Sequence, residues 1–333
     1  MSADASKAAV LVTGAAGFVA FHLIERLLRE GRSVVGIDNF DPFYGRVLKE
    51  RNLAELERVA KETGARFQFV EKDVCALDWS SFKGEKFESV IHLAAKAGVR
   101  PSLLAPEEYL RANVQGTLRV LELCRERGVH HVVSVSSSSV YGDSTPAPFR
   151  EDAPAMHPVS PYAASKRAAE LYCGTWAHLH RMRIAVLRYF TVYGPRQRPD
   201  LAIHKFTSLM LAGDPITLFG DGTTERDYTY VGDIVDGTLR AEKWIAGAEP
   251  GTCEAFNLGG GSTTSLAKLV ELLETALGKK ATIERTHTQP GDVQRTSADV
   301  SKAARLLGWK PGTSMPEGLA SFAAWYRGSP ARP

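Results

Sequence analysis

The sequence predicts an α/β fold, a Rossmann-type, doubly wound parallel sheet followed by a smaller, mixed α/β C-terminal domain. Short apolar runs alternate with amphipathic helical stretches over the first 190 residues, and a glycine-rich turn separates the first run from the first helix. After Gly194 the pattern becomes irregular and richer in Pro, Gly and Thr. Strands separated by helices of this length form parallel sheets covered on both faces.

The expected strands are short apolar runs, and the expected helices carry apolar residues at helical spacing. The strands are Ala8 to Val12, Ser33 to Ile37, Phe67 to Val70, Ser89 to Leu93, Val129 to Ser134 and Ile184 to Tyr189. The helices are Phe18 to Arg29, Glu108 to Glu126, Tyr162 to His180, Ala202 to Ala212, Val231 to Ala246 and Leu266 to Leu277. We expect residues 1–190 to form the Rossmann domain and residues 191–333 a substrate-binding domain. Residues 228–247 are long, apolar and helical, so they should pack back on the first domain.

Composition and charge exclude several classes of protein. The 333 residues are 44% hydrophobic, which is enough for a substantial core, and the formal net charge of +3 is spread evenly along the chain. Such a balance does not fit binding to nucleic acid or to a membrane surface. The four cysteines lie far apart without CxxC spacing, and the N-terminus carries no signal peptide or membrane span. We therefore expect a cytoplasmic protein with reduced thiols and no metal site.

The segment TGAAGFVA, from Thr13 to Ala20, lies between the first strand and the first helix. Gly14 permits a tight turn, Gly17 lets a pyrophosphate approach the backbone, and Ala20 is small enough for close helix packing. The start of the helix then offers amide donors and the positive end of its dipole to a diphosphate. The context predicts dinucleotide binding, and a purely structural turn is the alternative.

Acidic residues follow the second and third strands. Asp38 comes 24 residues after Gly14, where a carboxylate accepts hydrogen bonds from the adenosine ribose and repels a 2′-phosphate. This position favours NAD over NADP, although Asp38 also suits the opening of a turn that runs to Pro42. Asp73 and Val74 are placed to meet the adenine, or Asp73 is an ordinary residue of a turn.

Two further motifs carry groups that fit proton transfer. Tyr162 and Lys166 are four residues apart and share one face of a helix, where a nearby cation lowers the phenol pKa from about 10. Ser137 belongs to a hydroxyl cluster at the end of a strand, where open α/β sheets bind ligands. A serine there can hold a substrate hydroxyl and relay its proton to Tyr162. The alternative for Tyr162 and Lys166, considered alone, is a solvated helix face. The alternative for Ser137, considered alone, is a serine-rich turn that caps the next segment.

Motifs along nearly the whole chain resemble the extended short-chain dehydrogenases/reductases, and among them the nucleotide-sugar 4-epimerases. They are TGAAGFVA, HLAAKAGVR from His92, ANVQGT from Ala112, SVSSSSVYG, PYAASK, RYFTVYGP from Arg188, GDGTTERDYTYVGDI from Gly220 and QPGDVQRTSAD from Gln289. Ala20 stands where the family usually has a third glycine.

The resemblance implies roles for residues that match the family's motifs. Ser137, Tyr162 and Lys166 are the implied catalytic group, with Tyr162 as base and Lys166 on the nicotinamide ribose. The implied NAD-binding residues are Gly14, Ala16, Gly17, Phe18, Val19, Asp38, Asn39, Asp73, Val74, Leu93, Ala94, Ala95, Lys96, Asn113, Tyr162 and Lys166. The helices Glu108 to Glu126 and Tyr162 to His180 are the pair that forms the family's homodimer.

The residues after Ser137 narrow the reaction. The family's 4,6-dehydratases carry an Asp-Glu pair there, and its uronate decarboxylases a Glu at the second position, whereas this chain has Ser138 and Ser139. With dehydration and decarboxylation disfavoured, the remaining reaction is oxidation and re-reduction of a single sugar carbon. Tyr162 would draw the C4 hydroxyl proton through Ser137 while hydride passes to NAD. The 4-keto sugar then turns its other face, hydride returns, and NAD is regenerated and retained.

Several segments resemble the UDP-glucuronate 4-epimerases more than the glucose/galactose enzymes. They are DNFDPFYGRVLKER from Asp38, AGVRPSL, RYFTVYGPRQRPD and GDVQRT. The glucose/galactose enzymes are expected to have Asn where this chain has Thr191. A uronate carboxylate suits an arginine or a hydroxyl cluster, which Arg198 and Ser136, Ser137 and Ser138 would supply. A grip of this kind would keep the 4-keto uronate, a β-keto acid, from losing carbon dioxide.

The resemblance implies two further substrate contacts, and several alternatives stay open. The resemblance puts Arg226 on the diphosphate and Asp292 on the nucleoside ribose. Arg198 equally suits an ordinary loop position, and Arg226 a pairing with Asp227. A UDP-glucose or UDP-N-acetylglucosamine 4-epimerase is the alternative enzyme, because Thr296 is smaller than the Tyr that some strict glucose/galactose enzymes have there, and an acetamido group would then also fit. A non-catalytic NAD-binding scaffold is the alternative from another class, but the complete Ser137, Tyr162 and Lys166 set argues against it.

Overall fold

The computed structural model describes residues 8–82, 84–286 and 294–328, and its main feature is a seven-stranded parallel sheet. The strand order is β10-β6-β5-β4-β1-β2-β3. The strands are β1 (Ala9–Thr13), β2 (Val34–Asp38), β3 (Phe67–Glu71), β4 (Phe87–His92), β5 (His131–Ser137), β6 (Arg183–Tyr189) and β10 (Cys253–Leu258). The order reverses between β1 and β4, and open α/β sheets bind ligands at such a switch point.

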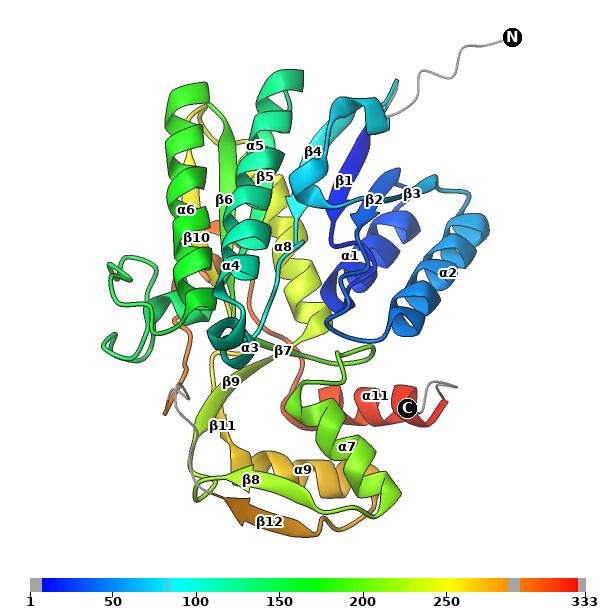
Figure 1. Cartoon of the computed structure of the whole chain (residues 1–333), viewed down its shortest axis with the longest axis vertical. Coiled ribbons are helices and arrows are strands. Elements are labelled where there is room, and N and C mark those ends of the chain that lie inside the picture. Colours follow the sequence, from blue (N-terminus) through cyan, green and yellow to red (C-terminus); the bar gives the residue numbers. More distant parts are fainter. Residues whose placement is uncertain (1–7, 83, 287–293, 329–333) are drawn as a thin grey trace.

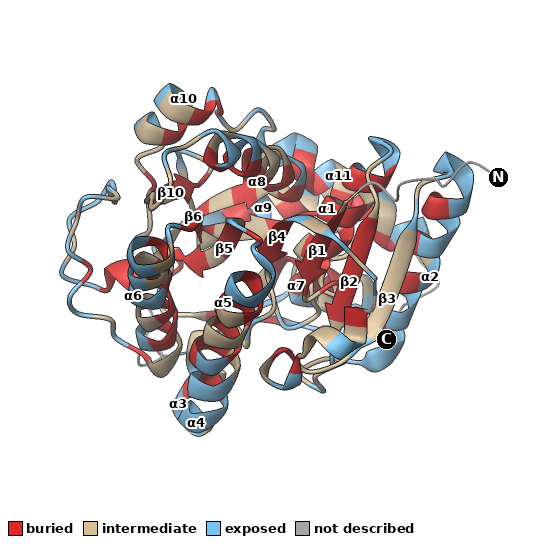
Figure 2. Cartoon of the chain, turned by 90° about the horizontal axis from the view of Figure 1, so that it is seen from above, coloured by how far each residue is buried: buried red, intermediate tan, exposed pale blue. Residues whose placement is uncertain are grey.

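Helices cover both faces of this sheet, which confirms the predicted fold class (Figure 2). On one face lie α5 (Gly116–Arg127) and α6 (Pro161–His180), and on the other α1 (Phe18–Arg29) and α8 (Val231–Ala246). The helix α2 (Arg46–Thr63) packs beside α1, and α10 (Ser301–Leu307) packs on α8. Apolar side chains such as Leu23, Val133 and Ile234 fill the space between the sheet and α1 and α8.

Two small sheets and three helices form the lower part of the view in Figure 1. One sheet contains β7 (Thr191–Tyr193), β9 (Glu225–Tyr230) and β11 (Thr263–Ser265), and the other contains β8 (Ile216–Phe219) and β12 (Ile283–Thr286). The helices are α7 (Ala202–Ala212), α9 (Leu266–Leu277) and α11 (Met315–Gly328). They enclose a separate core that includes Phe206, Leu273 and Phe322.

Helix α8 packs on β5 and β6, and the following strand β10 pairs with β6 in the main sheet. The main sheet therefore contains segments from beyond residue 190, and the division of the chain into domains at that residue stays a prediction. No helix in the described ranges has both the length and the apolar character needed to cross a membrane.

The predicted helix from Glu108 to Glu126 is interrupted in the structure. After α3 (Val99–Leu104), the chain forms α4 (Pro106–Tyr109), a π-helical segment η3 (Leu110–Gln115) and then α5. The π-helical turn contains the buried Asn113, and π-bulges are frequent at functional sites. Short 3-10 turns follow two of the strands: η1 (Val74–Ala76) and η2 (Trp79–Phe82) come after β3, and η4 (Ser138–Tyr141) comes after β5.

Candidate active site

A cavity of about 830 Å³ lies at the carboxyl ends of the parallel strands. Its size is within the range of small-molecule and cofactor sites. The predicted residues that line it are Gly14, Gly17, Phe18, Val19, Asp38, Asn39, Asp73, Val74, Leu93, Ala94, Ala95, Lys96, Ser136, Ser137, Ser138, Tyr162, Lys166, Thr191 and Arg198. Ala16 and Asn113 are buried, Arg226 lies away from the lining, and Asp292 lies outside the described residues.

The glycine turn brings the ends of β1 and β4 close together. Gly14 has φ of 74°, and a Cβ at this position would lie 2.9 Å from the backbone nitrogen of Ala94. The Ala94 amide donates to the Thr13 hydroxyl at 3.1 Å. Gly17 is the N-cap of α1 and supplies no side-chain cap, so the first amides of the helix are available to an anion. The turn fits the diphosphate of a dinucleotide.

Asp38 ends β2 at the wall of the cavity. Its carboxylate accepts the Ala16 amide at 3.2 Å and the Phe40 amide at 2.8 Å. Burial raises the pKa of Asp38, and the Lys49 charge and these two amides offset only part of that rise. Asp38 therefore opens a turn, which was the alternative to ribose binding, and Asp38 also lines the cavity.

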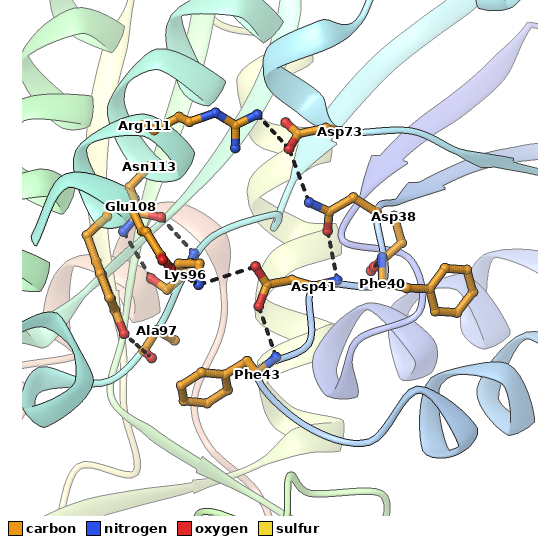
Figure 3. A network of polar contacts seen from close by, with 12 residues as sticks. Asp38, Phe40, Asp41, Phe43, Asp73, Lys96, Ala97, Glu108, Arg111 and Asn113 are labelled. Atoms are coloured by element: carbon orange, nitrogen blue, oxygen red, sulfur yellow. Dashed lines mark hydrogen bonds and ion pairs between the residues drawn. The ribbon is translucent and has the colours of Figure 1, made fainter. Parts of the chain in front are cut away.

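The loop after β2 is tied across the cavity to the loop after β4 (Figure 3). Asp41 pairs with Lys96 at 3.3 Å, and Lys96 also pairs with Glu108. Asn113 accepts the Lys96 amide at 2.8 Å and donates to its carbonyl at 2.9 Å. Asn113 thus supports the cavity wall through Lys96.

A second set of contacts in Figure 3 surrounds Asp73. Its carboxylate accepts from Asn39 at 3.2 Å and from Arg111 at 2.9 Å. Burial raises the pKa of Asp73, but the Cys75 amide and the Arg111 charge outweigh burial, so the pKa is lowered. Asp73 is therefore a stable carboxylate at the edge of the cavity.

Ser137, Tyr162 and Lys166 come together at the end of β5. Helix α6 starts beside this strand end, with Ser160 as N-cap accepting the Ala163 amide at 3.1 Å. Ser137 lies close enough to Tyr162 to offset part of the rise that burial causes in the pKa of the phenol, and the Ser137 hydroxyl donates to Ser139 Oγ at 3.2 Å. Lys166, one turn further, donates to the backbone carbonyl of Val135 at 2.8 Å. The strand and the helix together thus position a hydroxyl, a phenol and an amine around one point of the cavity.

The expected effect of Lys166 on the phenol is wrong for this structure. Burial raises the pKa of Tyr162, and Ser137 and the charge of Arg198 offset only part of the rise. Burial also lowers the pKa of Lys166 to about 8. Because the Lys166 amine is directed to Val135, the cation that acts on the phenol here is Arg198.

A buried ion pair, which the sequence reasoning missed, lies beneath this group. Ser136 donates to Glu170 at 2.6 Å, and Glu170 pairs with Arg188 at 2.8 Å. Ser136 lines the cavity, but its single hydroxyl proton is directed to Glu170 rather than to the cavity. The signal in the sequence was Glu170 itself, which follows Lys166 by one helical turn on the same face.

Arg198 and Thr191 enter the cavity from the segment after β6. Arg198 donates to Asp200 through Nε at 2.9 Å and Nη2 at 2.8 Å, and its guanidinium lies 5.1 Å from the ring centre of Phe43. Five cavity residues after β2 had no predicted role individually, and they are Asp41, Pro42, Phe43, Tyr44 and Lys49. An aromatic pair followed by a lysine directly after the Asp38 turn was the available signal.

Arg226 does not pair with Asp227. Arg226 donates to the carbonyl of Glu225 at 3.0 Å, whereas the buried Asp227 accepts the amides of Gly260 and Ala298. The alternative that paired these two side chains is therefore wrong, and the predicted diphosphate role of Arg226 stays a prediction.

The chain resembles proteins of known activity over nearly its whole length. A UDP-glucuronate 4-epimerase of Thermodesulfobacterium geofontis is 43% identical over 318 residues, which are 95% of each chain. The solved UDP-glucuronic acid 4-epimerase of Bacillus cereus, in complex with UDP-glucuronic acid and NAD, is 38% identical with a TM-score of 0.87 and covers 96% of this chain and 98% of its own.

A solved UDP-glucose 4-epimerase of Thermotoga maritima, with UDP-glucose, is 32% identical with a TM-score of 0.84, over 96% of this chain and 98% of its own. Residues 10–259 match the model of the NAD dependent epimerase/dehydratase family. That match spans the strand-turn-helix unit, the Ser137, Tyr162 and Lys166 group, and β10. The chain belongs to the NAD dependent epimerase/dehydratase family.

Proposed function

We propose that the protein is a UDP-glucuronate 4-epimerase that interconverts UDP-glucuronate and UDP-galacturonate with bound NAD. The observation that carries the proposal is one cavity lined by the catalytic candidates and by Thr191 and Arg198. The relatives from Thermodesulfobacterium geofontis and Bacillus cereus support the choice of a uronate. The serines after Ser137 support epimerisation over elimination, since no carboxylate occupies those positions.

The residues present fit NAD. The glycine turn and the uncapped start of α1 would hold the diphosphate, and Asp38 would hold the adenosine ribose. Lys166 would hold the nicotinamide ribose. NAD, when bound, supplies reversible hydride transfer at C4 of the sugar.

Ser137 and Tyr162 would move the proton of the C4 hydroxyl. Their closeness in one cavity would give a direct path from a sugar hydroxyl on Ser137 to the phenol. Burial raises the pKa of Tyr162, so the phenol keeps its proton until a nearby positive charge stabilises the phenolate. The same pair would return the proton to the C4 oxygen while hydride comes back to the opposite face of C4, which completes the inversion.

Arg198 and Thr191 would hold the uronate carboxylate. Asp200 engages Nε and Nη2 of Arg198, which fixes the guanidinium and leaves Nη1 for the ligand. The 4-keto uronate is a β-keto acid, so a fixed carboxylate protects its C5–C6 bond from alignment with the ketone.

The test is to incubate the purified protein, without added cofactor, with UDP-glucuronate, UDP-glucose and UDP-N-acetylglucosamine separately. We expect UDP-galacturonate from the first substrate and little turnover of the neutral sugars, followed by chromatography. Turnover of the neutral sugars alone would keep the epimerase chemistry and overturn the assignment of the substrate.

We also propose that the protein is a cytoplasmic homodimer. Helix α6 exposes Leu171, Tyr172 and Leu179, and α3 exposes Leu104. Apolar side chains of this size on neighbouring helices suit burial against a second copy. Sedimentation should give twice the chain mass, and Leu171→Glu combined with Leu179→Glu should give monomers.

A further inference from the structure

The loop from Gly194 to Leu201 carries Arg198 and packs against the NAD-binding half of the cavity. His22, on α1, donates through Nε2 to the carbonyl of Pro195 at 2.8 Å. Burial lowers the pKa of His22, so the ring is neutral and donates this bond without a charge. The loop is therefore bonded to the helix that starts at the glycine turn.

Arg196 makes two further connections, between the loop and the helices α1 and α2. Its guanidinium lies 3.9 Å from the ring centre of Phe21 on α1, and Nη1 donates to Asn52 on α2 at 2.8 Å. Asn52 in turn donates to the carbonyl of Ala16 at 2.9 Å. A continuous series of contacts thus leads from the glycine turn through Asn52 to Arg196, which lies two positions before Arg198.

Two costs are associated with this arrangement. Arg196 has φ of 65°, a left-handed conformation that is unfavourable for an arginine. Burial also lowers the pKa of Arg196, and none of the ion pairs found among the described residues includes it. A strained, partly desolvated arginine bonded to a neutral amide is expected where the geometry of a site depends on it.

We infer that Arg196 is a positioning residue that fixes the Arg198 loop to the glycine turn. The inference rests on the proposed function and extends it. Arg198 determines where the uronate carboxylate lies, and the glycine turn determines where the cofactor lies. Arg196 and Asn52 set the distance between the two, and so hold C5 and its carboxylate out of alignment with the C4 ketone.

Loss of this brace should therefore appear as decarboxylation of the 4-keto uronate. The C5–C6 bond breaks, the carboxylate leaves as carbon dioxide, and the electron pair forms the enolate of the C4 ketone. C5 then takes a proton from water, which gives a UDP-4-keto-pentose. The hydride removed from C4 stays on the cofactor, so one NADH accumulates for each decarboxylated sugar.

The experiment compares Arg196→Asn with Arg196→Lys and Asn52→Leu in the full-length protein. Asn tolerates the left-handed backbone but cannot reach Asn52, so it removes the brace without adding strain. Lys keeps the charge over Phe21. Arg240→Gln is the matched control, because Arg240 is an exposed arginine on α8 that pairs with Asp236. The readouts are KM and kcat for UDP-glucuronate, the share of keto-pentose, NADH absorbance, bound NAD and the thermal midpoint.

For Arg196→Asn and Asn52→Leu we expect about a tenfold rise in KM and in the share of keto-pentose, because each loses the partly buried hydrogen bond between the Arg196 guanidinium and Asn52. The KM and the share of keto-pentose of Arg196→Lys should lie between those of these variants and those of the wild type. Bound NAD should stay within about twofold of the wild type in both Arg196 variants, whereas Asn52→Leu also loses the bond to the Ala16 carbonyl and should retain less NAD. Arg240→Gln should match the wild type.

Two results would overturn the inference alone. In one, the wild type epimerises UDP-glucuronate and Arg196→Asn gives the same KM and the same share of keto-pentose. In the other, kcat, bound NAD and the thermal midpoint fall together without a change in product share, which is the pattern of a purely structural role. A wild type that does not convert UDP-glucuronate would overturn the proposed function first, and this inference with it.

Discussion

Glu170 and Arg188 form a buried bidentate ion pair beneath the catalytic group, with bonds of 2.9 and 2.8 Å and side chains only 5% and 4% exposed. The pair joins α6 to β6, and Glu170 also accepts the Ser136 hydroxyl at the end of β5. Burial raises the pKa of Glu170, but the Arg188 charge and the hydrogen bonds outweigh burial and lower it. The arrangement fixes the strand end that carries Ser137 to the helix that carries Tyr162 and Lys166.

Glu170→Gln should destabilise the protein strongly, because it leaves the Arg188 guanidinium buried without a negative partner. The expected loss is about 3–5 kcal/mol in the free energy of unfolding, measured by urea denaturation. Asp152→Asn is the control. It breaks an ion pair with Arg150 whose side chains are 63% and 71% exposed, and should cost about 1 kcal/mol or less. Equal losses for the two variants would contradict this account of the buried pair.

Tyr162→Phe should remove epimerisation while leaving the fold intact. The phenol is the group that the geometry places to exchange a proton with Ser137, and loss of general acid-base catalysis costs about 10²–10⁴-fold in rate. The rate with UDP-glucuronate, the content of bound NAD and the thermal midpoint are the measurements. Unchanged activity would favour a role for the protein as an NAD-binding scaffold.

Lys166→Met should change how stability depends on pH. Burial lowers the pKa of Lys166 from 10.5 to about 8, so between these values the unfolded chain binds more protons than the folded protein. As the pH rises from about 8 to 10.5, the wild type therefore gains stability from this residue. Below about pH 8 it carries the free-energy cost of a buried ammonium group. The variant lacks this pH-dependent contribution, so its free energy of unfolding relative to that of the wild type should be greatest near pH 7.

Urea denaturation of both proteins at several values between about pH 7 and about pH 10 measures that difference. The lost hydrogen bond to Val135 contributes a constant that does not depend on pH. A difference that stays flat over the whole range would show that Lys166 keeps its ordinary pKa in the folded protein.

The sequence was sufficient for the features that depend on local pattern. The predicted bounds of α1, α7, α8 and α9 are those of the structure, because each has a clear apolar face and a clear end. Ser137, Tyr162 and Lys166 were placed together because strand ends and helix starts meet at one edge of a parallel sheet.

Long-range packing explains what the sequence did not predict. The π-helical turn around Asn113 depends on the Lys96 backbone, which lies 17 residues away. The direction of the Lys166 amine depends on a carbonyl of β5, 31 residues away. The brace from Arg196 to Asn52 spans 144 residues and leaves no periodic signal in the chain.

Gly14→Ala tests whether the first glycine is needed for more than its backbone conformation. Gly14 and Gly31 have nearly the same φ, 74° and 76°, so alanine should cost about 1–2 kcal/mol of strain at either position. At Gly31 the added Cβ meets nothing within 4 Å, whereas at Gly14 it would lie 2.9 Å from the Ala94 amide nitrogen. Gly14→Ala should therefore force β1 and β4 apart, lower the free energy of unfolding by more than Gly31→Ala does, and lose bound NAD. Gly31→Ala should keep its NAD, and equal behaviour of the two variants, measured by denaturation and by release of the cofactor, would mean that the close approach to Ala94 does not support the NAD site.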